Sequence, residues 1–222
     1  MALMTGVEGW LSPREAEALF RCASACRGRG AIVEIGSWKG RSTIVLAAGS
    51  RAAAQSVVHA VDPHLGLARH GAGPTFSQFQ ANIAAAGVAD LVQSHVQSSA
   101  DAARGFQQPV ELIYIDGAHD YAAVLDDFTR WFPKVLDGGV MAFHDTVGYP
   151  GPRRVVREHV YRSRRFRRVR FADSLTYAEK VTRNTPMERL GNEMRWWINQ
   201  SYAAAIVLVR RLRTNAALKR IT

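Results

Sequence analysis

Two apolar stretches of the chain each end in acidic residues and histidines. VELIYIDGAH (110–119) ends with Asp116 and His119, and GGVMAFHDT (138–146) ends with His144 and Asp145. If the two runs form neighbouring parallel strands, their carboxyl ends lie about 4.8 Å apart. Two carboxylates at such ends can share one hard cation, and oxygen ligands with open positions favour Mg²⁺ or Mn²⁺ over Zn²⁺. We therefore predict Asp116 and Asp145 as metal ligands.

The two histidines of these motifs are candidates for proton transfer. Histidine changes its charge near neutral pH, so it can take the proton of a hydroxyl whose acidity a bound cation has increased. His119 lies where the next helix begins and could face the same site. On a regular strand His144 would point away from Asp145, although this alternation weakens at a strand end. We predict His119 as the general base, and His144 as the second choice for the base or as a further metal ligand.

The stretch VEIGSWKGRST (33–43) is a second candidate site, in which a strand leads through a glycine-containing loop into a helix. Gly36 and Gly40 permit a sharp turn and a close approach of a ligand to the backbone. The start of the helix directs unpaired N–H groups to the same place. The dinucleotide fingerprint G-x-G-x-x-G is not met, because Trp38 takes the place of its middle glycine. This loop therefore favours a smaller ligand without phosphates.

Two carboxylates accompany this loop. Glu34 lies within an apolar strand, where its burial is costly unless it is bonded, so it could organise the loop or contact a positive group of the ligand. Asp62, in HAVDP (59–63), can accept both hydroxyls of a ribose, and a turn-forming role before Pro63 is the alternative. A positively charged nucleoside such as S-adenosylmethionine fits both features. The predicted cofactor contacts are Glu34, Gly36, Ser37, Gly40, Ser42, Asp62, Ser98 and Asp116.

Alternating strand and helix patterns position these motifs. Strands are predicted at 31–37, 56–63, 91–98, 110–117 and 138–146, and helices at 13–28, 40–50, 75–87 and 121–136. Ser12 and Glu15 have the pattern of a cap and first turn for the first of these helices. A hairpin within 165–181 and a long helix from Pro186 complete the chain. The fold class is α/β, a Rossmann-like doubly wound sheet with a C-terminal helical extension, divided into residues 1–185 and 186–222.

Within the helix predicted at 121–136, Asp126 and Asp127 are assigned to a solvated face and Trp131 to the core. The glycine-rich segment 66–75 could be a flap over the site or a plain loop.

Charge is distributed unevenly along the 222 residues. The formal net charge is +10, but residues 1–150 carry −3 and residues 151–222 carry +13. The start of the chain lacks the pattern of a signal peptide, and no run of apolar residues is long enough to span a membrane. The only cysteines, Cys22 and Cys26, exclude a disulfide scaffold and are interpreted as buried thiols. These features favour a cytoplasmic enzyme.

The basic C-terminal part has two notable patterns. Residues 153–170 contain nine arginines, which suit an anionic partner or an acidic surface of the protein itself. The last segment has apolar or small residues at three- and four-residue steps: Met187, Leu190, Met194, Trp197, Ser201, Ala204, Leu208 and Leu212. We favour a helix that covers the domain or forms a homodimer, with peripheral membrane contact as the alternative. Nucleic-acid binding ranks lower, because few aromatic residues interrupt the arginines.

Together, VEIGSWKGRST, VDP and IYIDGAHDYAAVLDDFTRWFPKVLDGGVMAFHDT resemble class I S-adenosylmethionine-dependent methyltransferases. The subgroup that these motifs resemble is the metal-dependent sugar O-methyltransferases of macrolide and methylmannose polysaccharide assembly. The resemblance covers about residues 30–150 and implies a seven-stranded sheet, S-adenosylmethionine, a magnesium-type ion and a small-molecule or oligosaccharide acceptor. In the subgroup an acidic ligand often precedes the second aspartate, and His144 takes that place here. An RNA methyltransferase and a membrane-surface glycolipid methyltransferase are the alternatives.

Overall fold

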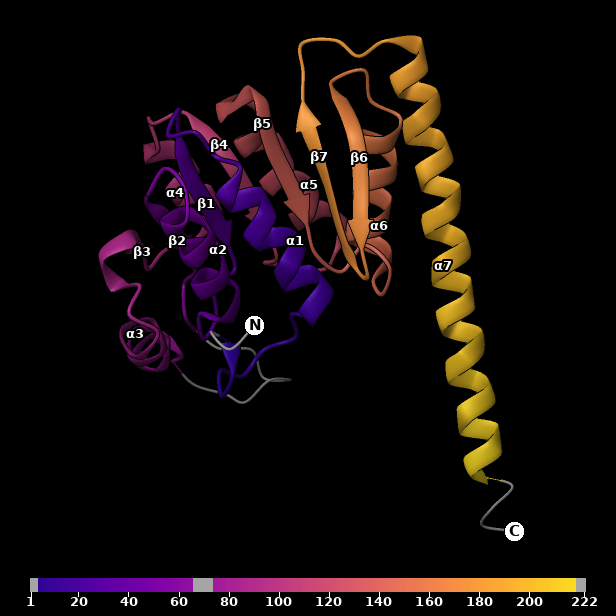
Figure 1. Cartoon of the computed structure of the whole chain (residues 1–222), viewed down its shortest axis with the longest axis horizontal. Coiled ribbons are helices and arrows are strands. Elements are labelled where there is room, and N and C mark those ends of the chain that lie inside the picture. The colour runs from indigo at the N-terminus through magenta and orange to yellow at the C-terminus, as the bar shows by residue number, and fades with distance from the viewer. Residues whose placement is uncertain (1–3, 66–73, 219–222) are drawn as a thin grey trace.

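A seven-stranded sheet forms the centre of the protein, with the strand order β3-β2-β1-β4-β5-β7-β6 (Figure 1). The computed structural model describes residues 4–65 and 74–218. The first five strands are parallel, whereas β7 runs antiparallel to β5 and to β6. The strands are β1 (Ala31–Ile35), β2 (Val58–Val61), β3 (Val92–His95), β4 (Val110–Ile115), β5 (Val135–Phe143), β6 (Phe166–Ala172) and β7 (Leu175–Lys180). The predicted Rossmann-like sheet and late hairpin are both confirmed.

Helices cover both faces of this sheet, as the alternating pattern predicts. One face packs on α1 (Pro13–Ser24), α2 (Arg41–Arg51) and α3 (Phe76–Ala85), and the other on α4 (Ser99–Gly105), α5 (Tyr121–Trp131) and α6 (Pro150–Val156). The central strands β1 and β4 are buried along their whole length, because both of their faces contact helices. Their side chains alternate between the two cores: Leu112 and Tyr114 enter one, and Ile113 and Ile115 enter the other.

The segment between α5 and β5 differs from the prediction. Helix α5 ends at Trp131 because Phe132–Lys134, with Pro133 inside it, forms a short 3-10 turn, and β5 begins directly afterwards at Val135. Trp131 is fully buried, as predicted. The assignment of Asp127 to a solvated face is wrong. Asp127 shares the buried side of α5 with Val124 and Trp131, and burial raises its pKa to about 6.

Two further predictions concern the N-terminal helix and the glycine-rich segment. Cys22 and Cys26 are free and buried, and burial raises the pKa of each thiol to about 12. They are therefore unreactive packing residues, as interpreted from the sequence. Most of the glycine-rich segment 66–75, for which a flap and a plain loop are the alternatives, lies outside the described residues.

Helix α7 (Pro186–Leu218) runs along the β6 edge of the sheet and continues past the ends of β6 and β7 (Figure 1). Its Asn192 side chain accepts a hydrogen bond from the backbone N–H of Val169 and donates one to the carbonyl of Phe166. Further along, the Tyr202 hydroxyl donates to Asp173. One side of α7 therefore covers the domain. Among the described residues, none of the helices is long and apolar enough to cross a membrane.

Candidate functional site

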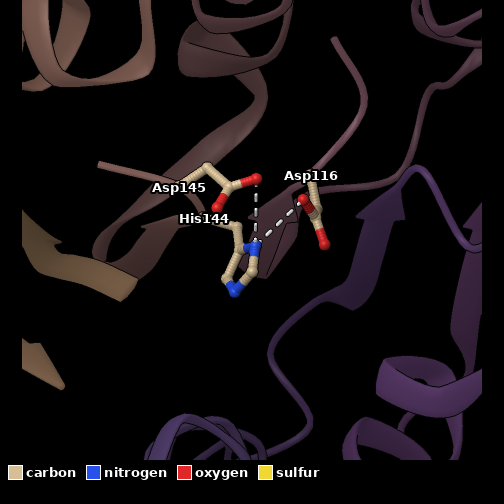
Figure 2. Close-up of side chains that lie close together, drawn as sticks. All are labelled: Asp116, His144 and Asp145. Atoms are coloured by element: carbon tan, nitrogen blue, oxygen red, sulfur yellow. Dashed lines mark ion pairs between the residues drawn. The ribbon is translucent and has the colours of Figure 1, made fainter. Parts of the chain in front are cut away.

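The carboxyl ends of β4 and β5 form the candidate site. These strands are parallel neighbours with Ile115 opposite Phe143, so Asp116 and His144 leave the sheet side by side. Asp145 follows in the left-handed backbone region, with φ +57°. The regular alternation of a strand ends at this residue, which allows the side chains of His144 and Asp145 to face one point (Figure 2).

Asp116, His144 and Asp145 form a compact cluster (Figure 2). The Nδ1 atom of His144 lies 3.2 Å from Oδ1 of Asp116 and 3.7 Å from Oδ2 of Asp145. One ligand atom from each of the three residues lies within 4.8 Å of the other two. This spacing allows a single metal ion to contact all three side chains.

His119, from the loop between β4 and α5, joins the same cluster. Its Nε2 atom lies 2.7 Å from Oδ2 of Asp145, and its ring stacks on Tyr149 with 4.3 Å between the ring centroids. The carboxylate and the aromatic ring together fix the orientation of this imidazole. The predicted convergence of Asp116, Asp145 and His119 at one edge of the sheet is confirmed, while their roles in catalysis stay predictions.

The cluster also includes a residue from α1 that the sequence analysis missed. Oε2 of Glu15 lies 3.3 Å from Nε2 of His144, and Oε1 accepts a hydrogen bond from the backbone N–H of Ser174. Glu15 also forms a capping box with Ser12, the predicted cap of this helix. That local role accounts for a glutamate at this position, so the sequence gives no signal of its contact with His144.

Tyr114 is the second residue that the sequence analysis missed. Its hydroxyl donates a 2.8 Å hydrogen bond to Oδ2 of Asp116, while Oδ1 of the same carboxylate faces His144. Such a contact orients a candidate ligand and leaves its other oxygen directed into the site. The strand pattern identifies Tyr114 only as a core residue.

The charges of these groups shift each other's pKa values. Burial lowers the pKa of His144, but Asp116, Asp145 and Glu15 outweigh this effect and raise the pKa well above its usual value. Burial raises the pKa of Asp145, but the imidazoles of His119 and His144 outweigh this effect and hold the pKa of this carboxyl below its usual value. The raised pKa means that His144 favours its protonated form, which offsets part of the negative charge of the carboxylates. Metal binding at Nδ1 requires loss of that proton, so metal affinity should increase with pH.

The loop between β1 and α2 lies directly beside this cluster. Gly36 has φ +87°, and a Cβ atom there would lie 2.3 Å from the carbonyl oxygen of Asp116. Only glycine permits this contact between the two backbones. Gly40 has φ +86° and caps α2 without a side chain. The sharp turn expected at Gly36 and Gly40 is confirmed, while the close approach of a ligand to this loop stays a prediction.

Two buried polar atoms near this loop have no partner among the described residues. Glu34 is fully buried, and its Oε2 accepts a hydrogen bond from the hydroxyl of Thr43, but its Oε1 has no hydrogen bond. The hydroxyl of Ser37 is also buried without a partner in the described structure. Such atoms are costly unless a ligand satisfies them, so this is where a polar ligand would bind.

The remaining predicted cofactor residues have structural contacts of their own. Asp62 accepts hydrogen bonds from the backbone N–H groups of Trp38, at 2.8 Å, and His64, at 2.6 Å, so its turn-forming role is confirmed and it also fixes the glycine loop. Ser98 caps α4 by accepting a hydrogen bond from the backbone of Asp101. Ser42 is buried in the first turn of α2. Their contacts with a cofactor stay predictions.

The burial of Glu34 has a measurable consequence. Burial, together with the charges of Asp116 and Asp62, raises its pKa from 4.5 to about 8. Between these values the folded state holds a proton that the unfolded chain releases, so stability falls as pH rises. At about 1.4 kcal/mol per unit, this effect amounts to several kcal/mol. We expect the ligand-free wild type to lose that much stability relative to Glu34→Gln between pH 5 and pH 8, as measured by urea unfolding.

The exposed glutamate of the Glu17–Arg21 pair provides the control. Glu17→Gln should follow the wild type at both pH values. If the stabilities of Glu34→Gln and of the wild type changed in parallel between pH 5 and pH 8, that result would contradict a protonated Glu34.

A family model described as a methyltransferase domain matches residues 33–146, which include the glycine loop, Asp62 and the metal-site candidates. The match covers half of the chain, and the chain belongs to this family of methyltransferase domains. The prediction of a methyltransferase is thereby confirmed.

Solved structures share the fold. The O-methyltransferase TomG from Streptomyces achromogenes, in complex with S-adenosylmethionine, is 21% identical with a TM-score of 0.57, over 78% of this chain and 82% of that chain. The O-methyltransferase NovP is 18% identical with a TM-score of 0.65, over 76% and 80%. An rRNA methylase from Streptococcus thermophilus is 12% identical with a TM-score of 0.57, over 78% and 100%. Because one of these proteins is involved in tomaymycin synthesis and another is an rRNA methylase, the fold does not determine the acceptor.

Proposed function

We propose that this methyltransferase transfers the methyl group of S-adenosylmethionine to a hydroxyl of a sugar or of a glycosylated natural product, with a divalent metal ion at the acceptor. The observation that carries the proposal is the cluster of Asp116, His144 and Asp145, with His119 held against Asp145. The cluster adjoins the glycine loop at the carboxyl edge of the sheet, where ligands bind in doubly wound folds.

The cofactor proposal is supported by the buried atoms without partners. The methionine end of S-adenosylmethionine carries an ammonium group, which would donate to the unsatisfied oxygen of Glu34. The hydroxyl of Ser37 would bond to the same part of the cofactor, and Asp62 would accept its ribose hydroxyls. TomG, which has the same fold, was solved with this cofactor.

The donor set of the cluster fits a divalent ion. Carboxylate oxygens are the ligands that Mg²⁺ and Mn²⁺ prefer, and the imidazole of His144 shifts the preference towards Mn²⁺. An ion bound there would lower the pKa of an acceptor hydroxyl. Because Asp116, Asp145 and Glu15 favour a positive charge at His144, its imidazole is poorly suited to accept a further proton as a base, whereas a metal ion could replace its proton at Nδ1.

His119 takes the proton in the proposed reaction. The acceptor oxygen attacks the methyl carbon in line with the breaking bond to sulfur, and S-adenosylhomocysteine leaves with both electrons of that bond. The hydroxyl proton passes to the imidazole of His119, which Asp145 and Tyr149 hold in place. The chain therefore contributes mainly alignment and proton removal, because the sulfonium methyl group is already activated.

We expect removal of divalent ions to abolish turnover while S-adenosylmethionine binding persists. The enzyme is dialysed against EDTA and then supplied with Mg²⁺ or Mn²⁺, and radiolabelled methyl transfer is measured over a panel of hydroxylated acceptors. Mn²⁺ should restore more activity than Mg²⁺, because one of the ligands is a nitrogen. Binding of the cofactor alone is measured by calorimetry in EDTA as the control. Full turnover in EDTA would contradict the metal-dependent mechanism.

A further inference from the structure

The outward side of α7 carries a row of large apolar side chains: Met187, Leu190, Met194, Trp197 and Ile198. Each has between 50% and 76% of its surface exposed. Their three- and four-residue steps place them on one side of the helix. The opposite side, with Asn192, Asn199 and Ala203, is buried. We call the five exposed residues the apolar row.

The apolar row is unusual for a surface that contacts only water. Single exposed apolar residues are common, but a contiguous row that includes a tryptophan marks a contact surface. In Figure 1, α7 forms the outer edge of the molecule beside β6. The apolar row therefore faces away from the domain, where another surface can reach it without displacing any element.

Arginines of the domain pair with the acidic residues near the apolar row. Glu193 pairs with Arg157 at 2.7 Å, and Glu188 lies 3.7 Å from Arg167, so arginines of the domain neutralise both acidic residues in the described part of α7. Arg195, on the same helix, is exposed, and it forms no ion pair within the part of the chain that the structure describes. Residues 151–222 as a whole carry a net charge of +13.

We propose that α7 binds to the surface of an anionic lipid membrane. The apolar row would enter the boundary between headgroups and acyl chains, with the arginines beside it near the lipid phosphates. A second copy of the chain is the competing occupant. Pairing through α7 would bring together the C-terminal parts of two chains, residues 151–222, each with a net charge of +13, whereas a negatively charged membrane complements this charge. The proposal concerns binding only and does not depend on the acceptor or on the metal.

The test uses the full chain and vesicles of defined composition. We expect the wild type to sediment with vesicles that contain phosphatidylglycerol, to stay in solution with pure phosphatidylcholine, and to bind less at high salt. The affinity of the double variant Met194→Glu/Trp197→Glu for these vesicles should fall by about tenfold or more, since the variant places charge where the apolar side chains enter the lipid. The matched control, Gln107→Glu/Gln108→Glu, adds the same charge at exposed positions before β4 and should bind only slightly more weakly.

A second variant separates folding from binding. Met187→Gln/Leu190→Gln alters the apolar row without adding charge, and circular dichroism verifies that each variant is folded. Absence of wild-type binding to the phosphatidylglycerol vesicles would overturn the proposal. The proposal would also be overturned if both variants of the apolar row bound these vesicles as strongly as the wild type, because arginines elsewhere on the protein would then make the contact with the lipid. A dimer in sedimentation velocity that the row variants dissociate, without vesicle binding, would assign the surface to a second copy.

Discussion

Replacing Asp145 by asparagine is expected to lower turnover by about 10³-fold, since loss of several kcal/mol of stabilisation by the metal ion corresponds to this factor. Asp145 contributes twice to the site. Its Oδ2 lies 2.7 Å from Nε2 of His119 and 3.7 Å from Nδ1 of His144, so the variant weakens the metal site and releases the proposed base. Turnover is measured under saturating cofactor with Mn²⁺.

Asparagine is the informative replacement at this position. Asp145 has φ +57°, a conformation that asparagine tolerates, whereas alanine would add backbone strain to the loss of charge. The matched control is Asp126→Asn on α5, which removes an exposed carboxylate whose partner is Arg130. The control should keep wild-type turnover. Wild-type turnover in Asp145→Asn, with unchanged metal affinity, would exclude Asp145 as a ligand.

The sheet and the location of the site could be predicted because both depend on local patterns. Parallel strands buried on both faces read as continuous apolar runs, and β1 and β4 are such strands. Polar residues directly after β4 and β5 converge because parallel neighbours end at the same edge. The proximity of Asp116 and Asp145 therefore follows from the strand order alone, without any side-chain geometry.

The parts that could not be predicted depend on distant contacts or on a single backbone angle. Glu15 contacts His144 across most of the chain, and its capping role already accounts for it locally. The orientation of His144 depends on the left-handed backbone of Asp145, which a strand pattern does not specify. Asp127 looked solvated beside Asp126, but only Asp126 is exposed, because the helix turns Asp127 towards Val124 and Trp131.

The cluster places an imidazole beside its two aspartates. A metal ion there would therefore have only two carboxylates among these three side chains. Glu15 supplies a carboxylate on the far side of His144, so the imidazole has an acidic partner at both ring nitrogens. A carboxylate behind a ligating histidine makes its other nitrogen a stronger donor. The cluster can therefore use an imidazole ligand and still favour a divalent cation.

His119→Ala is expected to lower turnover by about 10²- to 10⁴-fold, the usual contribution of a general base. The affinity for S-adenosylmethionine should not change, because His119 lies in the loop after β4 and contacts Asp145 and Tyr149. Single-turnover methyl transfer and calorimetry with the cofactor measure the two quantities separately. His159→Ala is the control, since His159 is partly buried and its ring lies 5.3 Å from that of Phe128, in a tilted contact.

The double variant His119→Ala/Asp145→Asn shows whether the two side chains act as one unit. If Asp145 orients the imidazole that accepts the proton, removing either residue already disables proton transfer. The double variant should then be little slower than the slower single variant, as for groups that function together. Independent roles would instead multiply the two effects. Wild-type turnover in His119→Ala would assign proton removal to another group and leave Asp145 only its place beside the metal ion.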